Sequence, residues 1–445
     1  MTATHNEVRE RLERAGVRYL LAQFADLHGI AKGKLLPLAH LDDLVDPGAG
    51  FAGPSIWGTG LPRHGARSEF YGRGVLASAQ VLPWQPDTAR VVCNGYVAGE
   101  PFEGCPRQTL QRVLARLADR GWTLNVGIEP EFFLFTRNAQ GQLVAADALD
   151  DLDKPSYDLK SLERGPIARC LRALTETLGT LGFDTLQIDH EDAPGQYELN
   201  YAYADALTAA DRFMLFKLAA HAVAEQHGLV FSLMPKPFAD RPGSGLHFHV
   251  SITDRDGRAV FAQGGGLSDL GRAALGGLLA HAPALTALHA PTVNSYKRLV
   301  VGRSLSGTTW APAHIGWGSN NRTLTARVTA GRIEWRVPDG STNVYLALAG
   351  VAAAFLDGIE RKLDPGVPIE EDVYEWPEAR FAERGVFTLP QTLGAALDAF
   401  EADAALRAAL GAHVSNQFLE LKRMEWIEYC RQVSDWEWRQ YGAAY

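Results

Sequence analysis

The segment DHEDAPGQYELN, residues 189–200, places Asp189, Glu191 and Glu198 around a tight turn. If DAPG is a four-residue hairpin loop, Asp189 faces Glu198 and Glu191 faces Gln196 across the two strands. Acids of the same charge that lie directly opposite each other on neighbouring strands repel. The sequence therefore predicts that a cation or a proton transfer uses these carboxylates.

Three further segments carry charged residues at every second position: GIEPEFFLF, GSGLHFHVSI and GRIEWRVP. Side chains at positions i and i+2 of a strand share a face. The predicted same-face groups are Glu129 with Glu131, His247 with His249, and Arg332 with Glu334 and Arg336. Carboxylates combined with histidine suit a divalent ion such as Mg²⁺ or Mn²⁺.

Each of these features has a plainer interpretation when taken alone. A single Glu-x-Glu is most often a solvated face, and a lone His247 is more often a core histidine. The segment RPGSGLH lacks the lysine that makes a phosphate-binding loop specific, so it reads as a turn. Their combination in one chain favours a site for anionic ligands, because arginines accompany it at Arg298, Arg322, Arg327, Arg332 and Arg336.

The composition is that of a globular protein of two or three domains: 445 residues, 46% hydrophobic and 21% charged, with a net charge of −9. No run of Lys and Arg interleaves with aromatic residues, which argues against nucleic acid as a partner. The four scattered cysteines predict reduced thiols in the cytoplasm and no disulfide. The N-terminus lacks a signal-like apolar run, and the longest apolar run, residues 345–356, is too short for a bilayer, so no membrane partner is expected.

Helices and strands alternate along the chain, which predicts an α+β fold. The first helix is expected to be capped by Asn6 and to end at Gly16, and a later helix to start at Thr208–Asp211 and end at Gly228. Residues up to about 102 read as short strands with Gly-rich loops. A helix from Pro106 then leads into a larger domain, and the apolar run 345–356 reads as a buried helix.

The segments GIEPEFFLF, HEDAPGQYE, MPKPF, GSGLHFHVS, PTVNSYKRL, NNRTLTARV and RIEWRVPDGSTNVYL resemble, in this order and over nearly the whole chain, the signatures of the glutamine synthetase superfamily. The resemblance implies a small β-grasp-like N-terminal domain, residues 1–105. It implies a larger catalytic domain, residues 106–445, with a curved antiparallel sheet and surrounding helices. It also implies homo-oligomers, commonly dodecamers, with sites between neighbouring subunits.

The same resemblance implies roles for individual residues. Glu131, Glu191 and Glu198 would hold one divalent ion, and Glu129, His247 and Glu334 would hold a second beside the ATP phosphates. Gly243, His247, Arg298 and Arg336 would bind L-glutamate. Glu129, His249, Ser251, Arg322, Arg327 and Arg332 would contact ATP, and Arg322 and Arg336 would assist catalysis. The implied reaction forms γ-glutamyl phosphate, which an amine then attacks.

The sequence departs from the ordinary family where ammonium would bind. Ala52 stands in place of the aspartate of FDGSSI, and Pro242 in place of the asparagine of NGSGMH. The segment VGRSLSGTTWAP, residues 301–312, has no acid where the family has the glutamate of PGYEAP. These changes resemble the branch of the family that joins glutamate to alkylamines. Trp57, Thr308 and Trp310 would make room for a methyl group, or the two tryptophans would pack a subunit interface.

Asp189 replaces a histidine of the ordinary family two positions before Glu191. We therefore expect Asp189, with Glu198 beside it, to bind methylammonium and remove its proton, while Glu191 stays on the metal. The alternative is that Asp189 only forms a salt bridge with an arginine.

Three functions remain open from the sequence: a glutamate–methylamine ligase, a divergent glutamine synthetase that uses ammonia, and a non-catalytic sensor of nitrogen status. Other amines, such as ethylamine, isopropylamine or aniline, are further alternatives for the first. Tyr374 lies where some relatives carry an adenylylated tyrosine, and we expect it to be a plain surface residue.

Overall fold

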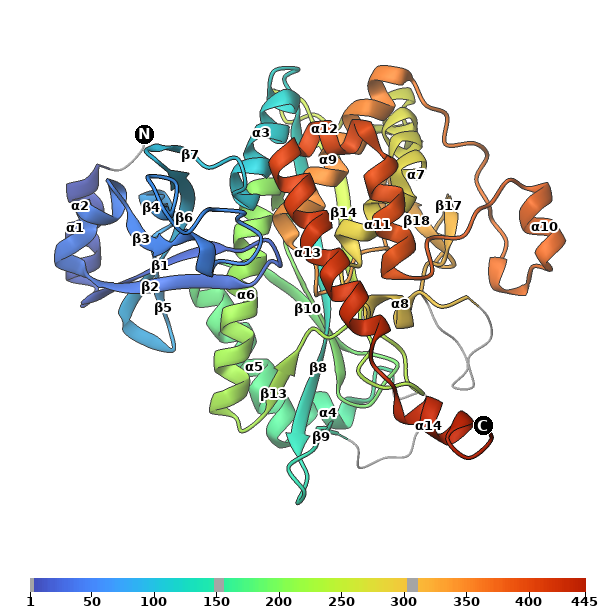
Figure 1. Ribbon diagram of the computed structural model, residues 1–445, viewed down its shortest axis with the longest axis horizontal. Helices are drawn as coiled ribbons and strands as arrows, with labels where there is room; N and C mark the ends of the chain where they lie inside the picture. The colour runs from blue at the N-terminus through green and yellow to red at the C-terminus, as the bar shows by residue number, and fades with distance from the viewer. Residues whose placement is uncertain (1–3, 148–155, 302–310) are drawn as a thin grey trace.

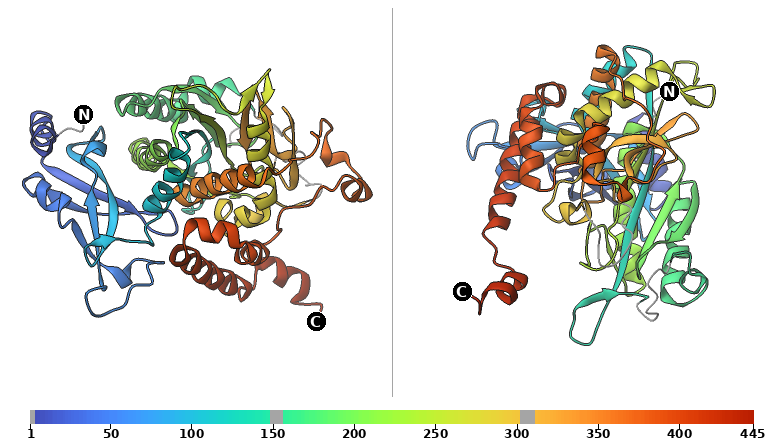
Figure 2. Two further views of the ribbon diagram at one scale, coloured as in Figure 1. Left: turned by 90° about the horizontal axis from the view of Figure 1, so that it is seen from above. Right: turned by 90° about the vertical axis from the view of Figure 1, so that its right-hand side faces the viewer.

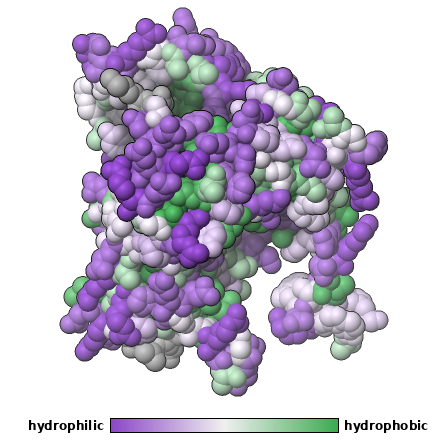
Figure 3. All heavy atoms as spheres, turned by 90° about the vertical axis from the view of Figure 1, so that its left-hand side faces the viewer, coloured by the Kyte–Doolittle hydropathy of each residue, from purple (hydrophilic) through white to green (hydrophobic). Residues whose placement is uncertain are grey.

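The computed structural model describes residues 4–147, 156–301 and 311–445. It contains two main β-sheets, each with a hydrophobic core of its own (Figure 1). The surface on the N-terminal side is mostly hydrophilic, with hydrophobic side chains in the recesses between hydrophilic ones (Figure 3).

The N-terminal part builds a seven-stranded sheet in the order β2-β1-β6-β4-β3, with β5 and β7 also paired to β6. Its elements are α1 (His5–Arg14), β1 (Tyr19–Ala25), β2 (Ala31–Pro37), α2 (Leu41–Val45), β3 (Ala49–Ala52), β4 (Glu69–Gly74), β5 (Gln80–Leu82), β6 (Gln85–Val97) and β7 (Glu100–Pro101). Strand β1 runs parallel to β6 and antiparallel to β2, so the sheet is mixed.

The rest of the chain builds a ten-stranded sheet in the order β10-β11-β8-β14-β19-β18-β17, and β9, β12 and β13 also pair with β8. Its strands are β8 (Thr123–Arg137), β9 (Leu143–Ala145), β10 (Thr185–His190), β11 (Gln196–Tyr201), β12 (Ala204–Asp205), β13 (Val230–Ser232), β14 (Leu246–Thr253), β17 (His314–Ser319), β18 (Leu324–Thr329) and β19 (Arg332–Trp335). The pairing is antiparallel, as expected, except that β17 and β18 are parallel. A small hairpin is formed by β15 (Ala262–Gln263) and β16 (Gly266–Leu267).

Helices cover one face of the large sheet, among them α3 (Pro106–Ala118) and α6 (Ala206–Gln226), which pack against β8 (Figure 2). The other helices of this part are α4 (Leu159–Glu163), α5 (Gly165–Thr180), α7 (Asp269–His289), α8 (Ser295–Arg298), α9 (Val344–Arg361), α10 (Glu378–Glu383), α11 (Leu393–Ala402), α12 (Ala404–Leu410), α13 (Ala412–Cys430) and α14 (Asp435–Tyr441). The predicted buried helix is α9, whose apolar side chains lie in the core. Within the described residues no helix is both long and apolar enough to cross a bilayer.

Strand β14 shows why the two faces of the large sheet differ. Its even-numbered residues, such as Phe248, are fully buried in the core, whereas His247 and His249 point to the opposite face. Strand β8 alternates in the same way, with Ile128 in the core and Glu129 on the other face. The predicted period-two pattern is therefore confirmed, and it aims the charged side chains at one face.

Two predicted helix starts are wrong. Helix α1 is capped by Thr4, whose side chain accepts from the Glu7 N–H in a capping box, and not by Asn6. Helix α6 is capped by Asp205, which accepts from the Thr208 N–H, so the helix begins before Thr208. The cap is in each case an oxygen-bearing side chain a few residues earlier in the chain.

The predicted boundary between the two domains, at residues 105 and 106, stays a prediction. Cys105 belongs to the N-terminal core, and α3 begins at the next residue, Pro106. Arg107 then joins the two parts, because its guanidinium donates to both carboxylate oxygens of Asp211 on α6 and to the Asn94 side chain on β6.

Candidate active site

A cavity of about 570 Å³ opens on the charged face of the large sheet. One part is acidic and is lined by Glu129, Glu131, Glu191, Asp192 and Glu198. Another part is basic and is lined by Lys236, Lys297, Arg298, Arg322 and Arg336. The cavity therefore offers neighbouring surfaces of opposite charge, which suits a substrate or a set of ligands that carries both charges.

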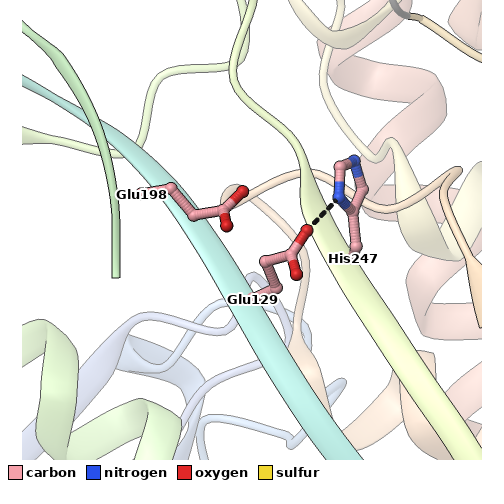
Figure 4. A group of neighbouring side chains, drawn as sticks. All are labelled: Glu129, Glu198 and His247. Carbon is pink, nitrogen blue, oxygen red and sulfur yellow. Dashed lines mark hydrogen bonds and ion pairs between the residues drawn. The ribbon is translucent and has the colours of Figure 1, made fainter. Parts of the chain in front are cut away.

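Glu129 lies at the centre of the acidic part. Its Oε1 atom is 2.7 Å from Nδ1 of His247, and its Oε2 atom is 3.0 Å from Nε2 of His249. The Glu198 carboxylate points toward the same place from β11, the neighbour of β8 (Figure 4). Oxygen and nitrogen atoms of Glu129, Glu198 and His247 come within 4.8 Å of one another, as do those of Glu129, His249 and Glu334.

These donors fit a divalent cation. Carboxylate oxygens suit Mg²⁺ and Mn²⁺, and neutral imidazole is a common partner. These two groups of neighbouring donors differ from the two predicted sets of metal ligands. Glu129 belongs to both groups, and His249 belongs to one of them. The reason is that both histidines hydrogen-bond Glu129. Which of the six predicted ligands holds which ion stays a prediction.

Burial and mutual repulsion disfavour negative charge on two of the acids. Burial, followed by the charges of Glu131 and Asp192, raises the pKa of Glu191 to about 8. Burial, followed by the charges of Glu129, Glu131 and Glu191, raises the pKa of Glu198 to about 10. Such carboxylates are ready to take up a positive charge, either a proton or a cation.

Glu129 and Glu334 behave in the opposite way. Burial alone would raise the pKa of Glu129, but the hydrogen bonds to His247 and His249 hold it well below its ordinary value. Burial likewise opposes ionisation of Glu334, whose pKa is nevertheless lowered by the charges of His247 and Arg336. The site therefore holds both ionised acids and acids that resist ionisation.

Two predicted arginines converge on Glu334. Arg327 lies directly opposite it on β18, and its Nε atom donates to Glu334 Oε2. Arg336 Nη1 donates to Glu334 Oε1 over 2.5 Å. Arg332 lies on the same face of β19 as Glu334, and Ser251 lies on the same face of β14 as His249. Arg322 is exposed and lines the cavity. Their predicted contacts with ATP stay predictions.

The loop formed by residues 243–245 lies close beside Arg298. A side-chain carbon at Gly243 would come within 2.6 Å of the Pro235 carbonyl oxygen, and one at Gly245 within 2.7 Å of Nε2 of His247. Arg298 is itself fixed, since its guanidinium donates to the carbonyl oxygens of Arg336 and Val337 over 3.0 Å. At Gly243 the close atom belongs to the backbone, so a larger residue there would force the backbone to shift, whereas at Gly245 it would displace the side chain of His247 or Arg298.

Asp189 lies directly opposite Glu198, in the predicted hairpin register. It does not line the cavity; its carboxylate accepts from the Gln187 side chain over 3.0 Å. Burial, with a contribution from the Glu129 charge, raises the pKa of Asp189. Across residues 4–147, 156–301 and 311–445 it has no arginine partner, so the predicted alternative of a salt bridge finds no support there.

Several cavity residues were not expected from the sequence: Ser156, Tyr157, Asp192, Gln196, Lys236 and Lys297. The two lysines lie inside MPKPF and NSYKRL, so those motifs could have indicated them. Ser156 and Tyr157 carry no periodic pattern. Tertiary contacts hold them, since the Ser156 hydroxyl donates to Asp192 and the Tyr157 N–H donates to the His190 carbonyl.

The resemblance placed Ala52, Trp57, Thr308 and Trp310 where the amine would bind. Ala52 and Trp57 do not line the cavity of their own chain, and Trp57 is 62% exposed. Thr308 and Trp310 lie outside the described residues. We expected Tyr374 to be a plain surface residue, and this prediction is wrong. It is half-buried, and its hydroxyl donates to the Ala311 carbonyl over 2.8 Å.

A model of the glutamine synthetase catalytic domain matches residues 103–441. Together, the two-sheet fold, the acidic and basic cavity and this match show that the chain belongs to the glutamine synthetase family.

The chain is also similar to individual members over nearly its whole length. It is 48% identical to the glutamate–methylamine ligase of Methyloversatilis universalis, over 98% of each chain. It is 40% identical to the glutamine synthetase of Rhizobium leguminosarum bv. phaseoli, over 95% of each. A solved structure of a GmaS/ADP complex covers 98% of this chain and 99% of its own, with a TM-score of 0.90 and 39% identity. A solved structure of apo GmaS without ligand covers 100% of each chain, with a TM-score of 0.89 and 38% identity.

Proposed function

We propose that this protein is an ATP-dependent carbon–nitrogen ligase. It joins the γ-carboxylate of L-glutamate to methylamine and releases γ-glutamylmethylamide, ADP and phosphate. The observation that carries the choice of amine is the 48% identity to a glutamate–methylamine ligase over 98% of the chain. The cavity supports the reaction class, because an attack of one anion on another needs concentrated positive charge.

The proposed metal ligands are Glu131, Glu191 and Glu198 for one divalent ion, and Glu129, His247 and Glu334 for the other. Bound there, Mg²⁺ or Mn²⁺ would neutralise the charge of the ATP phosphates. Arg322, Arg327 and Arg332 face those phosphates, and His249 and Ser251 border the nucleotide. Gly243 and Arg298 bind L-glutamate, with Arg336 beside the reacting carboxylate.

The reaction has two steps. A γ-carboxylate oxygen of glutamate attacks the γ-phosphorus of ATP, which forms γ-glutamyl phosphate and expels ADP. Methylammonium, with a pKa of about 10 like that of a lysine, must lose a proton before its nitrogen can attack. Asp189, with Glu198 beside it, accepts that proton. The nitrogen then bonds to the acyl carbon, the bond to phosphate breaks, and the nitrogen loses a second proton.

We further propose a cytoplasmic homododecamer. All four cysteines are free, which agrees with a reducing compartment. Ala52 and Trp57 lie outside the cavity of their own chain, so a neighbouring copy would have to bring them to it. The C-terminal segment with α14 extends from the body, and Trp436 and Trp438 on it are exposed, which suits a contact between copies (Figure 2).

The test is ADP release with L-glutamate and a series of amines: methylamine, ethylamine, isopropylamine, aniline and ammonium. One methyl group in an apolar pocket is worth about 1 to 3 kcal/mol, so kcat/KM for methylamine should exceed that for ammonium by about ten- to two-hundred-fold. Mass spectrometry of the product identifies the amide.

A divergent glutamine synthetase is the second candidate, since the chain is also 40% identical to glutamine synthetases. Equal kcat/KM for ammonium and methylamine would favour it. A higher kcat/KM for another amine of the series would make that amine the proposed substrate in place of methylamine. Binding of amine without any ADP release would favour a sensor.

A further inference from the structure

Gln196 connects two parts of the cavity that bind different ligands in the proposed reaction. It begins β11 and is 1% exposed. Its Nε2 atom donates to the Gly243 carbonyl over 3.0 Å and to the Ser244 hydroxyl over 3.3 Å. The same nitrogen lies 3.4 Å from Oε2 of Glu131. One buried carboxamide therefore touches both the glycine loop and an acid of the metal site.

The contact with Glu131 is reinforced by the loop itself. The Gly245 N–H donates to Oε2 of Glu131 over 2.8 Å, and the Glu131 N–H donates to the Gly245 carbonyl over 3.1 Å. Oε1 of Glu131 remains on the side of the acid cluster, 3.5 Å from Nε2 of His247. The loop and Gln196 thus hold one oxygen of Glu131 and leave the other turned toward the proposed ion.

The loop has little freedom to move alone. A side-chain carbon at Gly245 would lie 2.7 Å from Nε2 of His247 and 2.8 Å from Nη2 of Arg298. Ser244 is fully buried, and its N–H donates to the Pro235 carbonyl. A displacement of the Glu131 carboxylate is therefore passed through Gln196 to the groups that surround the loop, because close-packed groups transmit strain.

We propose that Gln196 is a positioning residue that makes cation binding at Glu131 and L-glutamate binding by the 243–245 loop depend on each other. The inference rests on the proposed function, since that function assigns the two ligands to the two parts. Coupling between two binding sites is reciprocal, and its usual size is about 5- to 150-fold in affinity. Gln196 itself binds neither ligand. A buried glutamine that only fills space would give no such coupling.

The experiment compares Gln196→Met with wild type in the full-length protein. Methionine has a similar length but no N–H group. Gln108→Met is the matched control, because Gln108 is also buried, at 8% exposed, but lies on α3 and does not line the cavity. Calorimetry measures the Kd of L-glutamate with and without Mn²⁺, in the absence of nucleotide and amine. We expect Mn²⁺ to tighten glutamate binding at least about fivefold in wild type and in the control. In Gln196→Met this factor should be clearly smaller than in wild type and in the control, while the direct hydrogen bonds between Gly245 and Glu131 remain.

The inference is overturned if Mn²⁺ tightens L-glutamate binding by the same factor in Gln196→Met as in wild type. It is also overturned if Mn²⁺ has no effect on L-glutamate binding in wild type. If Gln196→Met does not fold, Gln196→Leu replaces it, since leucine also lacks an N–H group and adds no charge beside Glu131. The same expectations apply to it. Glu131→Gln tests the proposed metal site separately. Unchanged Mn²⁺ binding in that variant would refute the metal assignment, whereas loss of binding there with intact coupling in the Gln196 variants would refute only the role of Gln196.

Discussion

Asp189 of β10 and Glu198 of β11 lie directly opposite each other in an antiparallel ladder, although both are acids. Each accepts a hydrogen bond from a neutral amide, Asp189 from Gln187 and Glu198 from Asn200 over 2.6 Å. Amide donors orient a carboxylate without cancelling its charge. Burial and neighbouring acids raise the pKa of both groups, so the pair favours a bound proton or cation.

Asp189→Asn should impair the use of methylamine specifically. The substitution keeps the size of the side chain and removes its ability to accept the proton. General-base catalysis commonly contributes about 10²- to 10⁴-fold, so we expect amide formation to fall by at least about 100-fold, with a higher KM for methylamine. The KM values for ATP and L-glutamate should stay within about twofold. Asp184→Asn, at an exposed position just before β10, is the control. Unchanged methylamine kinetics in Asp189→Asn would refute the assignment.

Glu131→Gln should abolish ATP-dependent turnover. The carboxylate lies in a group of acids whose repulsion a bound cation would relieve, and the amide cannot replace it as an anionic ligand. We expect weaker binding of Mg²⁺ and Mn²⁺ by calorimetry and no ADP release above background. An enzyme with full activity would show that Glu131 is not a metal ligand.

Gly245→Ala should weaken L-glutamate binding. The added carbon would lie 2.7 Å from Nε2 of His247 and 2.8 Å from Nη2 of Arg298, so one of these groups must move. A small misplacement of binding groups can cost about 10²-fold in rate, and we expect kcat/KM for glutamate to fall at least about tenfold. Gly179→Ala is the control, because the new methyl group in α5 would meet nothing within 4 Å. Equal kinetics in the two variants would contradict the account of the loop.

Stability should depend on pH through His281 of α7. Burial alone would lower its pKa, but hydrogen bonds to Asp403 over 2.5 Å and to Asp357 over 3.0 Å raise it above 6.5. A raised pKa means that the folded state holds the proton more tightly than the unfolded state. The stabilisation is therefore complete below pH 6.5 and is lost as the pH rises through the folded pKa.

Thermal melting of wild type and His281→Gln at a series of pH values tests this dependence. The difference in Tm should be largest below pH 6.5 and should shrink as the pH rises. His227→Gln, at the C-terminal end of α6, is the control for the loss of a histidine that does not contact Asp403 or Asp357. A constant difference between wild type and His281→Gln would show that His281 acts only through packing.

The sequence predicted the charged face of the large sheet well, because the period of two is a local property of the chain. The pairing of Asp189 with Glu198 followed from a four-residue loop for the same reason. Helix starts were predicted poorly. Several residues near Thr4 and Asp205 can act as caps, and only the final backbone conformation selects one. The cavity positions of Ser156 and Tyr157 depend on contacts with residues more than thirty positions away, which no local pattern encodes.

Among the described residues, strand β8 pairs with five other strands, whereas β10 lies at the end of the sheet order and pairs with β11 alone. Glu129 and Glu131 are thus anchored in a strand that is hydrogen-bonded to neighbours on both sides. Asp189 is on an edge strand. A substitution there disturbs few neighbours, so the proposed amine-binding residue can change in evolution independently of the proposed metal ligands on β8.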